Sequence, residues 1–167
     1  MSCLAATARP EQAGAAALEF ALVLPIFVAM LYGLINLGLV YYTQLAVSRA
    51  AEDGARAVDF LSNSSDYTSV KNEVLNSLAN SIVAPAASNG SYATRRSWLA
   101  SNVLPQISVD SSLSCAGVAA SGSLRVRVVY PYSTSAGTRL LPTITLPGVG
   151  SDIGVPSTLI GCAVVKQ

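Results

Sequence analysis

Few side chains in this chain carry reactive chemistry, and the cysteines come first. The 167-residue sequence contains no histidine and three cysteines, one of which, Cys3, lies near the N-terminus. Cys115 and Cys162 are candidates for a disulfide, a bond that requires an oxidising compartment. Two buried free cysteines are the alternative. A zinc site is disfavoured, because two thiolates without an imidazole fall short of the usual four ligands.

Other reactive constellations are sparse. Lys71 follows Thr68 and Ser69, a spacing at which an amine can activate a hydroxyl, but a solvated helix face explains the same residues more simply. Asp110 and Asp152 are possible loop ligands for calcium, yet no acidic loop pattern accompanies them. The chain also lacks the Gly-x-Ser-x-Gly and P-loop motifs. The sequence therefore predicts a protein that is no enzyme and has no catalytic residues, metal or cofactor.

The longest uniform feature is an apolar run. No charged side chain occurs from Phe20 to Ser48. As a helix at about 1.5 Å per residue this run spans roughly 40 Å, more than the ~30 Å hydrocarbon core of a bilayer. The chain is 51% hydrophobic with a net charge of +1, and its ten basic residues are scattered. These features predict one membrane segment and no nucleic-acid partner.

A lone carboxylate stands at the start of this run. Glu19 is the fifth residue after Gly14, within the stretch Gly-Ala-Ala-Ala-Leu-Glu-Phe-Ala-Leu-Val-Leu-Pro. That arrangement resembles the cleavage region of type IV prepilins, and its text resembles the TadE-like minor pseudopilins of tight-adherence (Flp, type IVc) pili. The passage Ala-Ala-Glu-Asp-Gly-Ala-Arg from Ala50 is also similar to the family, although the first arginine of the family pattern is absent.

The resemblance implies how the chain is processed, where it lies and what it assembles with. A prepilin peptidase would cut between Gly14 and Ala15, and residues 1–14 would be a cytoplasmic leader. Glu19 and Phe20 would act in assembly with other pilin-like subunits and the Tad assembly platform. The chain would be a single-pass protein of the bacterial inner membrane with a periplasmic C-terminal domain. Its implied function is that of a minor pseudopilin, a structural protein that supports pilus biogenesis and surface attachment.

Alternatives stay open at this point. Residues 46–48, Ala-Val-Ser, loosely fit an ordinary signal-peptide cleavage site. Basic residues do not settle the orientation, because Arg9 precedes the apolar run while Arg49 and Arg56 follow it. A signal-anchored periplasmic binding or adhesion module that never polymerises is the second hypothesis, and a membrane-anchored enzyme is the third.

Periodicity predicts that the apolar helix continues beyond the membrane, over residues 15–61. Pro25 is expected to kink it or melt it locally, and the polar Asn36 and Gln44 to bond between helices.

Glu52 and Arg56 form an expected i,i+4 ion pair. The part after the membrane carries a narrow apolar stripe of Val47, Ala51, Gly54, Val58 and Leu61.

Residues 62–167 are expected to form a small exported α+β domain. Helices are predicted over 66–83, with a buried face of Val70, Val74, Leu78 and Ile82, and over 92–104, with Trp98 as its anchor. Strands are predicted over 106–110, 124–130, 141–146 and 158–166, giving an antiparallel sheet of three or four strands. In the second strand Arg125 and Arg127 are expected on a solvated face. A Cys115–Cys162 bond would tie the region before this strand to the last strand.

Overall fold

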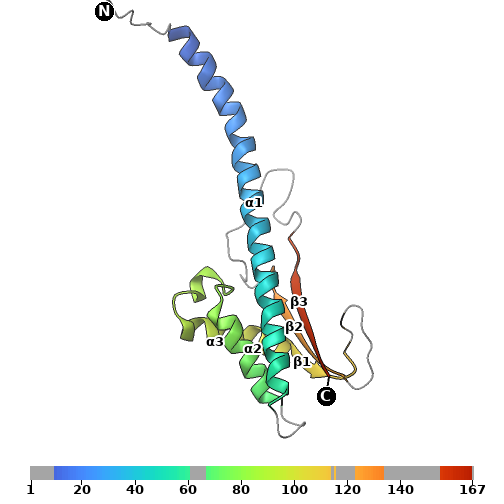
Figure 1. The fold of residues 1–167 in the computed structure, drawn as a ribbon. Coiled ribbons are helices and arrows are strands. Elements are labelled where there is room, and N and C mark those ends of the chain that lie inside the picture. The colour runs from blue at the N-terminus through green and yellow to red at the C-terminus, as the bar shows by residue number, and fades with distance from the viewer. Residues whose placement is uncertain (1–9, 61–66, 114, 116–122, 134–154, 167) are drawn as a thin grey trace, which may run out of the picture. The chain divides into compact units, whose positions relative to one another are not determined.

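A computed structural model describes residues 10–60, 67–113, 115, 123–133 and 155–166. The chain divides into two compact units, Met1–Gly38 and Leu39–Gln167, which are described separately. The first contains only helix within its described residues, namely the beginning of α1 (Pro10–Val58). The second, here called the C-terminal unit, contains the rest of α1, two further helices and a sheet (Figure 1). The predicted α+β class is confirmed.

Helix α1 starts and ends a few residues away from the prediction. It begins at Pro10 rather than Ala15, so the end of the expected leader belongs to the helix. Proline is well tolerated in the first turn of a helix, where its missing N–H has no helical partner to lose. The helix ends at Val58 rather than Leu61, and Leu61 lies outside the described residues. It continues through Pro25, so the expected local melting is not seen, while a kink there stays a prediction.

Three antiparallel strands form the sheet of the C-terminal unit. They are β1 (Ile107–Asp110), β2 (Ser123–Pro131) and β3 (Thr158–Lys166), in the spatial order β1-β2-β3 (Figure 1). These strands confirm three of the four predicted ones, and β3 has the predicted bounds. The predicted strand over 141–146 lies outside the described residues.

The two further helices are shorter than predicted. Helix α2 covers Thr68–Asn80 and α3 covers Tyr92–Asn102, with single 3-10 turns η1 (Ala86–Ser88) and η2 (Leu104–Gln106) after them. Ser91 sets the start of α3, because its hydroxyl accepts a hydrogen bond from the Thr94 N–H at 3.2 Å.

Most of the expected apolar face of α2 is buried, but its last member is not. Val70, Val74 and Leu78 are fully buried and are joined by Leu75. Ile82, predicted on the same face, lies beyond the end of α2, and its side chain is exposed. The four-residue spacing stops describing a face where the helix itself stops.

The predicted anchor of α3 also needs correction. Leu99 is its fully buried side chain, whereas Trp98 is half-buried. Trp98 packs against the buried Tyr130 with ring centroids 6.1 Å apart. The Tyr130 hydroxyl donates a hydrogen bond to the Val83 carbonyl oxygen. Burial raises the pKa of Tyr130, so this phenol stays neutral and continues to donate at physiological pH.

The small residues of α1 and β3 set how closely these elements approach. Val47, Ala51, Gly54 and Val58 are buried, which confirms the predicted stripe of α1 over the described residues. A Cβ added at Gly54 would lie 2.4 Å from a methyl group of Val74 in α2. A Cβ at Gly161 would lie 2.5 Å from the backbone oxygen of Val47. Within the C-terminal unit, α1 therefore packs directly on β3 and on α2.

Candidate functional site

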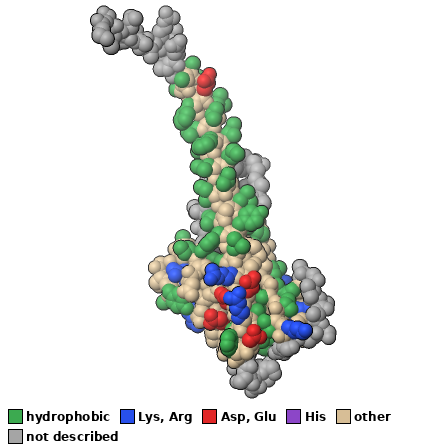
Figure 2. All heavy atoms as spheres, in the orientation of Figure 1, with side chains coloured by type: hydrophobic (Ala, Val, Ile, Leu, Met, Phe, Trp, Pro, Cys, Tyr) green, Lys and Arg blue, Asp and Glu red, His purple; other side chains and the backbone are tan. Residues whose placement is uncertain are grey.

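The first candidate site is the apolar surface of α1 within the first unit. Its large hydrophobic side chains, from Leu18 to Leu37, are exposed all around the helix. Among the described residues one helix, Gly14–Val58, is long and apolar enough to cross a membrane. The mean hydropathy of its most apolar stretch is 2.3, and no part of that stretch is buried. Figure 2 shows hydrophobic side chains along the apolar part of α1 and charged ones gathered on the C-terminal unit. Such a surface suits a membrane anchor, since water does not tolerate so much contiguous apolar area.

The residues predicted to act in processing and assembly lie at the start of this surface. Gly14 and Ala15 are exposed residues inside α1, and a Cβ added at Gly14 would meet nothing within 4 Å. Glu19 and Phe20 are exposed one turn later. Glu19 has no ion-pair partner among the described residues. The four residues thus share one accessible end of the helix.

The polar residues of the apolar run bond within the chain. The Asn36 side-chain amide donates to the Tyr32 carbonyl oxygen of the same helix at 2.8 Å. Gln44 donates to the Ser48 hydroxyl at 3.4 Å and to the Ile160 carbonyl oxygen of β3 at 2.9 Å. Both amides thus donate within the chain, and their expected bonds to other helices stay a prediction.

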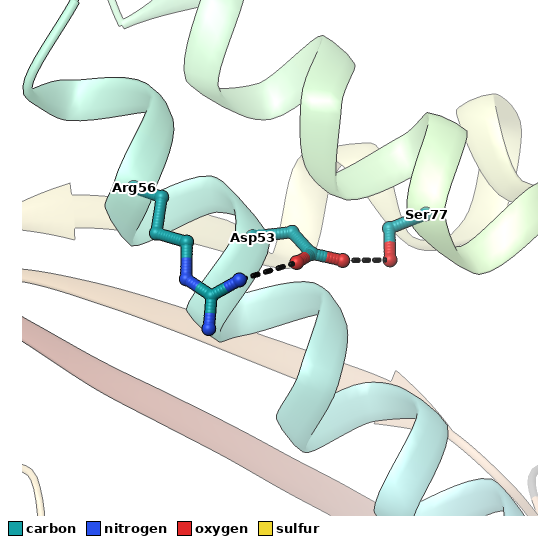
Figure 3. A network of polar contacts seen from close by, with 3 residues as sticks. All are labelled: Asp53, Arg56 and Ser77. Atoms are coloured by element: carbon teal, nitrogen blue, oxygen red, sulfur yellow. Dashed lines mark hydrogen bonds and ion pairs between the residues drawn. The ribbon is translucent and has the colours of Figure 1, made fainter.

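A charged face follows on the part of α1 that belongs to the C-terminal unit. Asp53 accepts a hydrogen bond from the Ser77 hydroxyl of α2 at 2.6 Å and lies 3.9 Å from the Arg56 guanidinium (Figure 3). The predicted partner of Arg56 was Glu52. Ser77 explains the difference, because its bond holds the Asp53 carboxylate in place beside Arg56. The ion pair itself contributes little, about 0–0.5 kcal/mol, because the Arg56 side chain is 75% exposed.

This charged face borders two open depressions that share Asp53 and Arg56. The larger, of about 460 Å³, lies between α1 and α2 and is also lined by Phe60, Ser69 and Glu73. Charges of both signs surround the smaller depression, which Arg49 and Glu52 also line. Mixed charges on an open surface suit contact with another protein better than an enclosed reaction site.

Cys115 and Cys162 lie at the outer face of the sheet, which is the face that points away from α1. Cys115 is bonded to Cys162 of β3, with Cα atoms 5.9 Å apart, inside the range that a disulfide spans. The chain that leads to Cys115 leaves β1 at Asp110, whose carboxylate accepts hydrogen bonds from the Ser112 N–H and hydroxyl at 2.8 and 2.9 Å. These bonds lower the pKa of Asp110. Leu113 therefore lies against β2, and Cys115 is joined to β3.

The segment that leads to Cys115 changes the environment of the arginines in β2. Arg125 was expected on a solvated face, but it is 7% exposed, and its guanidinium donates to the Leu113 carbonyl oxygen. Arg127 is half-buried and faces Cys162 in the strand register. The alternation of β2 indicated the correct faces, but it carried no sign that another segment covers the outer one.

The candidate residues for catalysis and metal binding do not form a metal site within the described part of the chain. No group of three His, Cys, Asp or Glu side chains there is placed to hold a metal. Ser69, near Lys71, lines the open depression between α1 and α2. Asp110 bonds to Ser112, and its suggested calcium partner Asp152 lies outside the described residues.

Comparison with known proteins supports the resemblance found in the sequence. Residues 14–56 match the family model described as TadE-like protein. No curated protein and no solved structure matched the chain. The matched region begins at Gly14 and ends within the buried stripe of α1. Residues 14–56 of this chain are therefore similar to the TadE-like family.

Proposed function

We propose that this protein is a minor pseudopilin that supports biogenesis of a tight-adherence Flp pilus and thereby surface attachment. The observation that carries the proposal is the TadE-like match over residues 14–56, on a helix whose apolar side chains are exposed. In this role α1 crosses the inner membrane with its N-terminus in the cytoplasm, and the C-terminal unit lies in the periplasm. An oxidising periplasm is consistent with the Cys115–Cys162 bond.

Processing would occur at the accessible end of α1. A prepilin peptidase would cut between Gly14 and Ala15, leaving 153 residues (167 − 14). Because this bond lies inside α1, the first turns must leave the helical conformation before an enzyme can reach the backbone. Glycine at this position helps, since it weakens a helix by roughly 1 kcal/mol relative to alanine.

Glu19 would then act in assembly with other pilin-like subunits. Cleavage creates an ammonium group at Ala15, and the corresponding group of a neighbouring subunit is a suitable partner for the Glu19 carboxylate. At 4 Å and an effective dielectric constant near 20, two such charges attract by about 4 kcal/mol before the cost of desolvation. An in-register neighbour offers this partner and a misplaced one does not. The competing role is interaction with the positive end of its own helix, worth about 0.3–1 kcal/mol.

The Glu19→Gln variant tests this role. It removes the charge but keeps the size and hydrogen-bonding capacity of the side chain. We expect normal cleavage and normal membrane levels, together with reduced crosslinking to the major pilin, fewer pili and weaker adhesion. Asp59→Asn is the matched control, because Asp59 is an exposed acid just after α1 in the C-terminal unit and lines neither depression.

The outcomes separate the hypotheses. Wild-type piliation in Glu19→Gln cells at equal expression would show that Glu19 serves only its own helix. Normal pili and adhesion in cells that lack the protein entirely would contradict the assembly role. A chain that stays in the membrane, never crosslinks to pilin and still supports adhesion would instead be a signal-anchored adhesion module.

A further inference from the structure

Exposed apolar side chains gather on and beside α1 at the start of the C-terminal unit. We call this group the apolar collar. Its members are Tyr41, Tyr42 and Leu45 of α1, Ile82 after α2 and Ile160 of β3. Their side chains are 44% to 71% exposed. Large hydrophobic residues so exposed at one place mark a surface that contacts something other than water.

Hydrogen bonds show that the three segments of the collar lie together. The Tyr42 hydroxyl accepts from the Ile82 backbone N–H at 3.2 Å, and Gln44 donates to the Ile160 carbonyl oxygen at 2.9 Å. Side chains of α1 thus form hydrogen bonds with the segment after α2 and with β3. They also give partners to two backbone groups that would otherwise meet the surroundings of the collar. A surface that approaches hydrocarbon needs its backbone groups paired in this way.

The position of the collar along the chain indicates what covers it. A helix needs about 20 residues to cross ~30 Å of hydrocarbon, and Glu19 marks the last charge before the apolar run. Twenty residues counted from Phe20 end at Leu39, so Tyr41 and Tyr42 follow directly after the hydrocarbon. Tyrosine is enriched at this depth of a membrane, where its ring is apolar and its hydroxyl meets water.

We propose that the apolar collar lies in the interfacial layer of the same bilayer that α1 crosses, with lipid as its occupant. The inference rests on the proposed membrane anchoring, but it adds that the C-terminal unit sits on the bilayer rather than standing off from it. The collar itself contains no charged residue, and the next charge along α1 is Arg49, one turn after Leu45. Because α1 already holds the unit beside the membrane, a weak affinity for lipid is enough.

The position of the collar at the lipid interface also affects assembly. A subunit that leaves the membrane must first remove its collar from the lipid interface. The collar then becomes available to bury against neighbouring subunits, so the same side chains that hold the waiting protein on the bilayer favour its packing after extraction.

Spin labels at single cysteines test the proposal in the full-length protein. In a Cys3→Ser background the native disulfide is kept, and labels are placed by Ile82→Cys or Ile160→Cys. The control is Phe60→Cys, an apolar residue 88% exposed just beyond the end of α1. The protein is reconstituted at low density in phosphatidylethanolamine and phosphatidylglycerol vesicles. Collision with oxygen, which concentrates in lipid, is compared with collision with a water-soluble nickel chelate.

We expect labels at positions 82 and 160 to be accessible to oxygen and to lose most of their access to the nickel chelate, while the label at position 60 keeps it. Equal chelate access at all three positions would overturn the proposal. Protection that appears only at high protein density would identify a protein partner and would likewise overturn it.

A separate measurement distinguishes failure of the anchor from failure of the collar. Protein that alkaline carbonate extracts from the membrane would contradict the proposed anchoring itself. Protein that resists extraction but shows water-exposed labels at 82 and 160 contradicts only the collar. Retention of the disulfide, assayed by thiol alkylation, shows that each labelled variant is folded.

Discussion

Helix α1 carries apolar side chains in both units, yet these side chains have opposite surroundings in its two parts. Before residue 39 its side chains are large and exposed, for example Leu22 and Phe27. After residue 46 its inner face consists of Val47 and small residues such as Ala51 and Gly54, all buried. Hydrophobicity alone therefore does not determine the environment of a helix. Small residues on one stripe allow protein to approach closely, whereas large residues on all sides leave only lipid as a suitable solvent.

Charged substitutions in the two parts of α1 should differ most in their effect on membrane retention. Met30→Asp combined with Leu34→Asp puts two carboxylates near the middle of the apolar run, where each costs about 2.5–3.5 kcal/mol of insertion free energy. We expect most of the protein to become extractable by alkaline carbonate. Arg49→Asp, at an exposed position of the C-terminal unit, should leave the wild-type membrane fraction unchanged. Equal membrane retention of the double variant would contradict the assignment of a span.

Removing the disulfide should affect only the C-terminal unit. The bond joins residues 47 positions apart, and the chain-entropy model gives about 4 kcal/mol for a loop of this size. The double variant Cys115→Ser/Cys162→Ser should therefore unfold at lower denaturant concentration while remaining in the membrane. Trp98 fluorescence of the detergent-solubilised protein reports this unfolding. Two freely alkylatable thiols in unreduced wild-type protein would show that the bond does not form in the cell.

Adding a methyl group tests the close contact between α1 and β3 within the C-terminal unit. Gly161→Ala places a Cβ against the backbone of Val47, which cannot rotate away, and should cost about 1–3 kcal/mol of stability. Gly33→Ala, where a Cβ meets nothing within 4 Å, is the matched control and should be neutral or slightly stabilising. Loss of stability in both variants, or in neither, would mean that the contact between α1 and β3 is not as close as described.

Sequence patterns predicted the elements that are governed by their own periodicity. The stripe of α1 and the bounds of β3 depend on spacing within one segment, and both were predicted. Ile82 was misplaced because nothing local marks Asn80 as the last residue of α2. The burial of Arg125 and the contact between Asp53 and Ser77 were not foreseen, since each depends on a segment brought near by the fold.

The candidate processing site was predicted from a resemblance and not from tertiary contacts. Gly14 and Glu19 match the spacing of the prepilin-like pattern, and their roles in processing and assembly stay predictions. The collar could not be found in this way, because Ile160 joins the side chains of α1 only when β3 packs against this helix.

The N-terminal sequence of the protein extracted from membranes decides whether the chain is processed as a prepilin. We expect the wild-type chain to begin at Ala15, Gly14→Leu to keep the full-length chain, and the control Gly33→Leu to be cut normally. Leucine at position 14 adds a side chain at the scissile bond and strengthens the helix that must unwind there. A wild-type chain that begins at Met1 would contradict processing, and one that begins near Arg49 would reveal an ordinary signal peptide and end the pilus interpretation.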